Sequence, residues 1–268
     1  MIPASLEYVR IASLDEALDA LGDPEAKVLA GGQSLVSMLK LRVLRPTLVV
    51  DIGGLELRGV DVLEGELHLG ALTVWDDLAR APELQRPALA ALAECAAGIG
   101  DLQVRNRGTV GGSLAHADPA SDLPAVLLAL GARLQLRSVT GDREVAASDF
   151  FLGPFSTALE PGELLTEVVV PVPPSGSGSA YASIEHPASG FALAGAAALV
   201  LPDGTRSAVT GISDRPLSLE PQGNVEGVEI FGDHFATAEY RRQLARVVIR
   251  RALESARARS QEDPQWRA

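Results

Sequence analysis

Two glycine-rich segments have the residue types and spacing that binding a phosphate group requires. The first is Ala30-Gly31-Gly32-Gln33-Ser34, which we expect between a short strand and a helix, and the second is Arg105–Ser113, of sequence RNRGTVGGS. Paired glycines let the backbone take a positive φ and expose successive N–H groups without a Cβ in the way. Such groups bind anions, and the positive end of a following helix adds to the attraction. The expected ligand is the pyrophosphate of a dinucleotide, which backbone dipoles can hold without a basic patch.

Either loop alone more often forms only a tight turn, because short glycine motifs match many unrelated proteins. Neither continues as Gly-Lys-Ser/Thr, which excludes a Walker A loop, and neither spaces its glycines as G-x-G-x-x-G, which excludes the Rossmann fingerprint. Two such loops in one chain, the second followed by Asp118-Pro119 and by Asp122-Leu123-Pro124, favour a binding site over two independent turns.

The composition excludes several other kinds of site. The net charge of −12 over 268 residues disfavours a general nucleic-acid or anionic-membrane partner. The single cysteine, Cys95, cannot form an internal disulfide, an iron–sulfur cluster usually needs about four thiolates, and the four histidines lack metal-site spacing. We therefore expect neither metal ligands nor a catalytic residue in this chain. No uncharged apolar stretch reaches the roughly 18 residues that span a bilayer, and the N-terminus lacks a signal-peptide pattern, so we expect a soluble cytoplasmic protein.

The pattern of elements indicates an α+β fold. Strands and helices alternate over the first 170 residues or so, whereas the last 90 predict a hairpin around Asp203-Gly204 and then a long helix from Thr237. The Pro-, Gly- and Ser-rich stretch 171–179 is the best domain boundary. The other expected elements are a helix with a capping box at Ser13–Glu16, strands at Leu48–Ile52, Leu67–Ala71, Arg133–Val139 and Leu164–Val170, helices at Thr73–Arg80, Ala88–Ala97 and Ala125–Leu130, and an irregular segment 214–235.

Eight segments together give the chain a family resemblance. It resembles the FAD-binding medium subunit of molybdenum hydroxylases, which include aerobic carbon monoxide dehydrogenase and bacterial relatives of xanthine dehydrogenase. The most specific segment is residues 99–132, IGDLQVRNRGTVGGSLAHADPASDLPAVLLALGA. The other segments are MIPASLEYVR, LAGGQSL, LVVDIGGL, LHLGALTVWDDL, PGELLTEVVVP, EHPASGFALAGAAALV and AEYRRQLARVVIRRAL, so that the resemblance covers nearly the whole chain.

The resemblance implies a fold and its division into domains. Residues 1–172 would form an FAD-binding domain of the vanillyl-alcohol-oxidase (PCMH) type, with two α/β subdomains at about 1–55 and 56–172. A linker at 173–179 would lead to a C-terminal domain at 180–268, like that of carbon monoxide dehydrogenase flavoproteins, built of an antiparallel sheet with helices.

The resemblance also implies which residues bind FAD. His116 would lie near the flavin, Asp122 would contact the cofactor, and Leu164 and Leu165 would pack on the flavin or the adenine. The first pyrophosphate loop would be Lys27, Val28, Leu29, Ala30, Gly31, Gly32, Gln33, Ser34 and Leu35. The second would be Thr109, Gly111, Gly112 and Ser113.

Several of these residues have simpler structural interpretations, which stay open at this point. His116 could be a histidine at a helix entry that bonds to the backbone, and Asp118 and Asp122 could both cap the helix that opens at Pro124. Arg105 and Arg107 could face a partner or a phosphate, although surface ion pairing is more usual.

Two departures from the family pattern affect the expected site and interfaces. The family often has a lysine near the flavin at the position of Ser183, and a positive charge there would favour the reduced anionic flavin. The segment 214–239 is also shorter than usual, which affects the partner contacts expected of the C-terminal domain.

The function that the resemblance implies is electron transfer. Electrons would pass from the [2Fe–2S] clusters of a small partner subunit through FAD on this chain to an external acceptor. The molybdenum cofactor would lie on a large partner subunit, which would select the substrate, and the complex would be a dimer of heterotrimers. Two alternatives are a stand-alone flavin reductase or oxidase, and a non-catalytic scaffold that has lost FAD.

Overall fold

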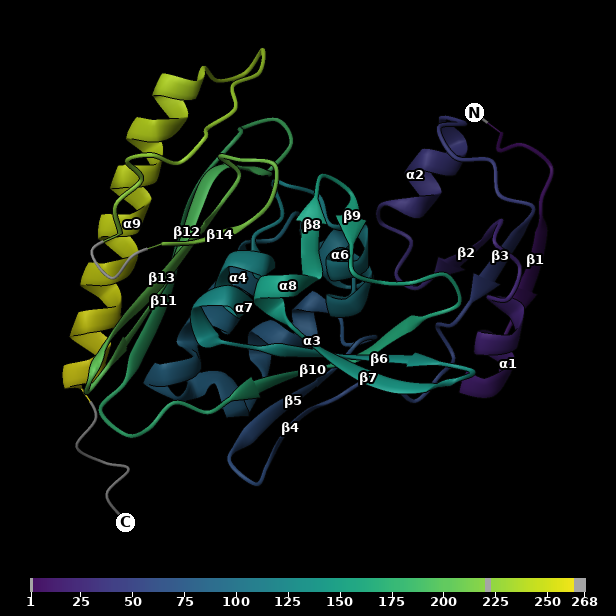
Figure 1. Cartoon of the computed structure of the whole chain (residues 1–268), viewed down its shortest axis with the longest axis horizontal. Coiled ribbons are helices and arrows are strands. Elements are labelled where there is room, and N and C mark those ends of the chain that lie inside the picture. Colours follow the sequence, from purple (N-terminus) through teal and green to yellow (C-terminus); the bar gives the residue numbers. More distant parts are fainter. Residues whose placement is uncertain (1, 220–222, 263–268) are drawn as a thin grey trace.

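The computed structural model describes residues 2–219 and 223–262, which form four sheets with helices packed against them (Figure 1). The helices are α1 (Leu14–Ala20), α2 (Leu35–Lys40), α3 (Trp75–Arg80), α4 (Ala90–Gly98), α5 (Leu102–Arg105), α6 (Val110–His116), α7 (Leu123–Leu130), α8 (Ala147–Phe150) and α9 (Ala238–Gln261), with 3-10 helices η1 (Pro82–Gln85) and η2 (Pro87–Leu89). The strands are β1 (Glu7–Arg10), β2 (Ala26–Leu29), β3 (Leu48–Asp51), β4 (Val60–Leu63), β5 (Glu66–Gly70), β6 (Arg133–Ser138), β7 (Gly141–Ala146), β8 (Phe151–Gly153), β9 (Ser156–Thr157), β10 (Leu164–Pro171), β11 (Gly178–Glu185), β12 (Ala192–Leu201), β13 (Gly204–Thr210) and β14 (Leu217–Leu219).

The N-terminal unit is a parallel sheet in the order β1-β3-β2 with helices α1 and α2. The predicted start of α1 is confirmed: the Ser13 hydroxyl accepts from the amide of Glu16 at 3.2 Å, while the Glu16 carboxylate accepts from Ala12 rather than from Ser13. Strand β2 ends at Leu29, so the first glycine loop leaves the sheet at the carboxyl ends of its parallel strands. Ligands bind at that edge in open parallel sheets, which places the loop suitably for a site.

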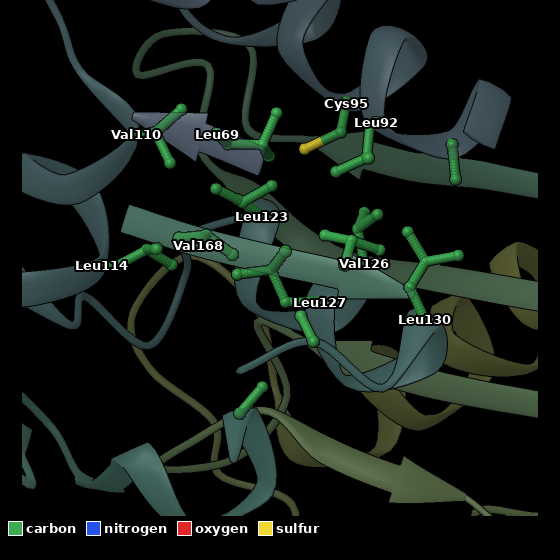
Figure 2. Packing of buried hydrophobic residues seen from close by; sticks show 14 of the residues in the cluster. Leu69, Leu92, Cys95, Val110, Leu114, Leu123, Val126, Leu127, Leu130 and Val168 are labelled. Carbon is green, nitrogen blue, oxygen red and sulfur yellow. The ribbon is translucent and has the colours of Figure 1, made fainter. Parts of the chain in front are cut away.

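The middle unit is an antiparallel sheet in the order β4-β5-β10-β6-β7, with helices on one face. Side chains alternate along β5: Leu67 and Leu69 are fully buried, while Glu66 and His68 keep partial exposure on the opposite face. Figure 2 shows Leu69 and Val168 of the sheet packing with the apolar side chains of α4, α6 and α7. Cys95 of α4 lies in this core as a buried free thiol.

The C-terminal unit is the antiparallel meander β11-β12-β13-β14, which is covered on both faces. Helix α9 lies along one face at the end of the molecule opposite to the N-terminal unit (Figure 1), and α7 packs on the other face. Strand β12 suits this two-sided burial because it is rich in alanine: Ala196 and Ala198 join the core under α9, whereas Ala197 and Leu199 join the core of the middle unit. The sheet therefore connects the two cores.

The predicted linker 173–179 overlaps a packed strand. Gly178 and Ser179 begin β11, and Gly178 lies so close to α9 that a Cβ there would be 2.3 Å from the carbonyl oxygen of Ala256. Because the C-terminal sheet shares core residues with the middle unit, the segment connects two packed parts of the molecule. The division into domains at residues 172 and 180 stays a prediction.

Most predicted elements are confirmed, but the helix predicted to begin at Thr73 begins at Trp75. Helix α7 ends where Gly131 takes φ 69°, and the Thr237 hydroxyl caps α9. The predicted β12–β13 hairpin is present, but its turn is Pro202-Asp203, because Leu201 pairs with Gly204. Thr73 does not cap α3, whose first turn follows Val74; its hydroxyl instead bonds the backbone of Gly59. The segment 214–235, predicted as irregular, contains the short strand β14, and its residues 220–222 lie outside the described part. No helix among the described residues is long and apolar enough to cross a membrane.

Candidate functional site

One cavity of about 670 Å³ lies where the three units meet. Its wall takes in the first glycine loop, the segment between α4 and α6, the segment between α6 and α7, the start of β10 and the turn before β12. All the predicted FAD-binding residues except Leu29 line this cavity: Lys27, Val28, Ala30, Gly31, Gly32, Gln33, Ser34, Leu35, Thr109, Gly111, Gly112, Ser113, His116, Asp122, Leu164 and Leu165. Residues far apart in the sequence thus share one concave surface, while their contact with FAD stays a prediction.

The first glycine loop presents unbonded amides. Within the described residues, the backbone N–H groups from Gly31 to Ser34 have no hydrogen-bond partner. Gly32 takes φ +75°, and a Cβ on Gly31 would lie 1.9 Å from the carbonyl oxygen of Arg107. Glycine at 31 therefore lets the two glycine-rich segments touch, and glycine at 32 turns the chain so that the amides stay unpaired. Successive free amides of this kind are an anion-binding arrangement.

The second glycine loop differs, and the expectation that it also presents free amides is wrong. Three consecutive N–H groups of this loop are used inside the protein: Val110 donates to the carbonyl of Thr73 at 3.0 Å, Gly111 to that of Ala71 at 2.8 Å and Gly112 to the Thr109 hydroxyl at 3.2 Å. The glycines here allow close packing instead, because a Cβ on Gly111 would lie 2.6 Å from the Cβ of Ala71. This loop fixes α6 against the end of β5 and contributes surface, rather than amides, to the cavity.

His116 is the last residue of α6, so the interpretation as a helix-entry histidine is wrong. Its ring lies 5.1 Å from the ring of Phe155, at an angle of 49°. Phe155 takes φ 54°, bonds through its amide to the carbonyl of Ala117 at 2.9 Å, and is 60% exposed. Both rings line the cavity. Phe155 is a site residue that was not predicted from the sequence, because a local motif does not reveal a contact made through a left-handed turn.

Asp122 and Asp118 do not cap α7 with their side chains, so that interpretation is also wrong. Asp118 accepts from the amide of Ala120 at 2.9 Å, within its own turn. Asp122 occupies the N-cap position without a capping bond, and its carboxylate instead accepts from the hydroxyl of Tyr181. The pKa of Asp122 is raised to about 6: burial raises it most, the Tyr181 hydrogen bond lowers it, and the charge of Glu185 raises it. Asp122 is therefore a carboxyl group of the cavity wall that ionises at a higher pH than an ordinary aspartate.

The apolar part of the wall comes from several elements. Leu164 belongs to the core of the N-terminal unit and Leu165 to that of the middle unit, so the start of β10 closes the cavity between them. The wall has further apolar residues that were not predicted from the sequence: Met38, Leu44, Leu72, Trp75, Ile99, Val104, Leu159 and Phe191. Such a mixture of apolar surface with a few polar groups is typical of cofactor sites.

Three further residues near the cavity have different roles: Arg105, Ser183 and His186. Arg105 donates to the carbonyls of Ile99 and Gly100 at 3.2 and 2.9 Å, so it holds the cavity wall instead of forming a surface ion pair. Ser183, at the position of the family lysine, is outside the cavity lining and donates to Glu185 at 3.3 Å. His186 forms the predicted turn before β12, in which its amide donates to the carbonyl of Phe191 at 2.8 Å.

Comparison with known proteins adds sequence and structural similarity over almost the whole chain. A family described as "FAD binding domain in molybdopterin dehydrogenase" matches residues 4–173. The glyceraldehyde dehydrogenase medium chain of Sulfolobus acidocaldarius is 37% identical over 280 residues, which cover 95% of this chain and 99% of that one. A structure of carbon monoxide dehydrogenase from Hydrogenophaga pseudoflava matches with a TM-score of 0.90 and 37% identity over 97% of this chain and 99% of that chain. Quinoline 2-oxidoreductase from Pseudomonas putida 86 matches with a TM-score of 0.90 and 29% identity over the same shares.

Proposed function

We propose that this chain, which belongs to the family of FAD-binding domains in molybdopterin dehydrogenases, transfers electrons within a molybdenum hydroxylase. The chain is the FAD-binding flavoprotein subunit of an oxidoreductase. In the proposal it receives electrons from the [2Fe–2S] clusters of a small partner subunit and passes them to an external acceptor. FAD would supply the chemistry, because it can take up two electrons one at a time, as one-electron clusters deliver them, and release them to an acceptor.

The observation that carries the proposal is the row of unpartnered amides from Gly31 to Ser34 on the cavity wall. Gly31 and Gly32 are half-buried, and an N–H group left unpaired there is unfavourable unless a ligand binds it; Gln33 and Ser34 are exposed, so their amides are free to meet such a ligand. Four consecutive N–H groups can stabilise a pyrophosphate without a lysine or arginine cluster, which agrees with the acidic composition of the chain.

The remainder of the cavity suits the other parts of FAD. Its volume of about 670 Å³ lies within the range of roughly 300–1,000 Å³ that is usual for cofactor pockets. Trp75, Leu164 and Leu165 offer apolar surface to the planar rings, while Asp122 and Ser113 offer oxygens to the cofactor's hydroxyl and N–H donors. In this scheme the residues of the chain bind and orient FAD, and none of them acts as a catalytic acid or base.

The partners in the proposal are a large molybdopterin-binding subunit and a small [2Fe–2S] subunit, assembled as a dimer of heterotrimers in the cytoplasm. Support comes from the relatives, which are named as medium chains of dehydrogenases or as the medium subunit of a hydroxylase. The Hydrogenophaga structure is described as carbon monoxide dehydrogenase that lacks one moiety of its molybdenum cofactor. Because the named relatives act on substrates as different as glyceraldehyde and quinoline, we propose that the large subunit selects the substrate.

The first experiment is the visible absorption spectrum of the purified chain, alone and co-expressed with its partner subunits, with mass identification of any chromophore released on denaturation. We expect FAD in stoichiometric amount. A complex that assembles but stays colourless after addition of FAD would contradict the proposal and leave the scaffold alternative. FAD bound by a chain that never associates with molybdenum or iron–sulfur subunits would favour the stand-alone oxidase or reductase.

A further inference from the structure

Tyr181 lies outside the cavity lining but reaches one of the polar groups on its wall. It sits in the middle of β11, opposite Ala197 of β12, and its hydroxyl donates to Oδ1 of Asp122. Asp122 does line the cavity and uses neither carboxylate oxygen to cap α7. Tyr181 thus bonds one carboxylate oxygen of Asp122 from outside the cavity lining, and the only other donor to the carboxylate among the described residues is the amide of Asp122 itself.

Gly195 on the neighbouring strand makes room for the tyrosine. A Cβ at position 195 would lie 2.2 Å from the hydroxyl oxygen of Tyr181 and 3.0 Å from its Cζ. Gly195 does not take a positive φ, so the backbone does not require glycine at this position. The space above Gly195 is therefore filled by the ring and hydroxyl of Tyr181.

The backbone of Tyr181 is bonded to helix α4. Its amide donates to Oε2 of Glu94 in α4 at 2.9 Å, and the second carboxylate oxygen of Glu94 pairs with Arg259 of α9. The strand that carries the tyrosine is thus fixed by both helices that pack against it. Side-chain and backbone bonds together give the hydroxyl one position, next to Asp122.

Burial makes the charge of Asp122 unfavourable, and the ionisable groups that interact with it include no cation to offset this. Those that interact with it are Tyr181 and Glu185 of β11 and Cys95 of α4, and none of them is a cation. His116 and Asp118 line the same cavity from the end of α6 and the segment after it. The hydrogen bond from Tyr181 is thus the largest effect that favours the ionised form of Asp122.

We infer that Tyr181 is a positioning residue that holds the Asp122 carboxylate as a hydrogen-bond acceptor for an N–H or O–H group of FAD, and that Gly195 is required for this position. The inference rests on the proposed function, because FAD supplies the donor. An ionised Asp122 can accept such a bond, whereas protonation removes that capacity at the atom concerned. FAD affinity should therefore depend on the protonation of Asp122, and Tyr181 should set the pH at which it changes.

The test is the dissociation constant of FAD measured by fluorescence between pH 5 and 8 on the full chain and on its complex. For the wild type we expect constant affinity above pH 7 and a loss of up to about tenfold per pH unit below the pKa of Asp122, which is about 6. Tyr181→Phe should weaken binding at pH 7 by about tenfold and move the midpoint to higher pH, because the bond that favours the carboxylate is lost. Gly195→Ala should shift the midpoint in the same direction. Tyr240→Phe, a tyrosine on the exposed side of α9, is the matched control and should behave as wild type.

Asp122→Asn provides a second route to the answer if Tyr181→Phe fails to fold. It should bind FAD with an affinity that no longer changes between pH 5 and 7. Wild-type FAD binding without any dependence on pH, or a Tyr181→Phe midpoint equal to that of the wild type, would overturn this inference and leave the proposed function standing. Absence of FAD binding by both the chain and its complex at every pH would overturn both.

Discussion

The two glycine loops look alike in sequence but are used in opposite ways. The first leaves the amides of Gly31 to Ser34 unpaired on the cavity wall, whereas the second bonds its amides to Thr73, Ala71 and Thr109. The half-buried amides of Gly31 and Gly32 cost free energy until a ligand pairs with them, while an amide bonded within the fold has already contributed to stability. The first loop is therefore the better candidate for the anion, and the second for the scaffold that supports it. Changes in the first should lower affinity, and changes in the second should lower stability.

The largest effect is expected for Gly31→Val. Its Cβ would lie 1.9 Å from the carbonyl oxygen of Arg107, which is backbone and cannot rotate away, so the first loop must move off the second. We expect FAD affinity to fall by about a hundredfold or more, the equivalent of about 2.7 kcal/mol, measured by titration of flavin-free protein. Gly204→Val is the control, because Gly204 is the first residue of β13, where a Cβ would have no atom within 4 Å. Full flavin content in Gly31→Val would contradict the role of this close approach.

The second-largest loss of FAD affinity is expected when a single amide of the first loop is removed. Gln33→Pro deletes one of the unpaired N–H groups of the first loop, and a hydrogen bond to a charged group contributes about 1.5–3 kcal/mol. We expect FAD to bind about 10- to 100-fold more weakly. The melting temperature of the flavin-free chain should change little, because that amide has no protein partner to lose.

Gln33→Ala is the matched control for that change. It also removes the bond from the Gln33 side chain to the carbonyl of Gly31 but keeps the amide. It should therefore retain most of the affinity. Equal losses in the two variants would mean that the side chain, not the amide, contacts FAD.

Asp122 resembles the first loop in one respect: its ionised carboxylate lowers the stability of the flavin-free chain. Its pKa of about 6 lies above the ordinary value of 3.8, so the folded state holds a proton that the unfolded state releases between these pH values. Stability from this group is thus present below about pH 4 and is lost as pH rises to about 6. Asp122→Asn should be more stable than wild type by about 1–3 kcal/mol at about pH 7.5. The difference should shrink towards about pH 4, as followed by urea unfolding at each pH, and a constant difference would exclude ionisation as its cause.

Local signals explain what the sequence predicted well. The hairpin near Asp203-Gly204, the helix end at Leu130 and the start of the long helix at Thr237 each depend on a few neighbouring residues. All three are confirmed, although the hairpin turn lies one residue earlier, at Pro202-Asp203. The clustering of the glycine loops around one cavity followed from the family resemblance rather than from spacing. The Tyr181–Asp122 bond and the use of the Gly111 amide by Ala71 join distant segments, and residue type alone does not reveal such pairings. Thr73 was misplaced for the same reason, because its hydroxyl bonds Gly59 on another segment.

The smallest effect, and the one that separates the loops most directly, is expected for Thr109→Ala. The Thr109 hydroxyl accepts the Gly112 amide at the start of α6, and loss of such a cap costs about 1 kcal/mol. We expect a small fall in the free energy of unfolding and less than about a threefold change in FAD affinity, even though Thr109 lines the cavity. Ser13→Ala removes the corresponding cap of α1 and should lower stability by a similar amount with no effect on FAD. If Thr109→Ala loses affinity as strongly as Gln33→Pro, the second loop contacts the cofactor directly. The assignment of FAD binding to the first loop and of structural support to the second would then be wrong.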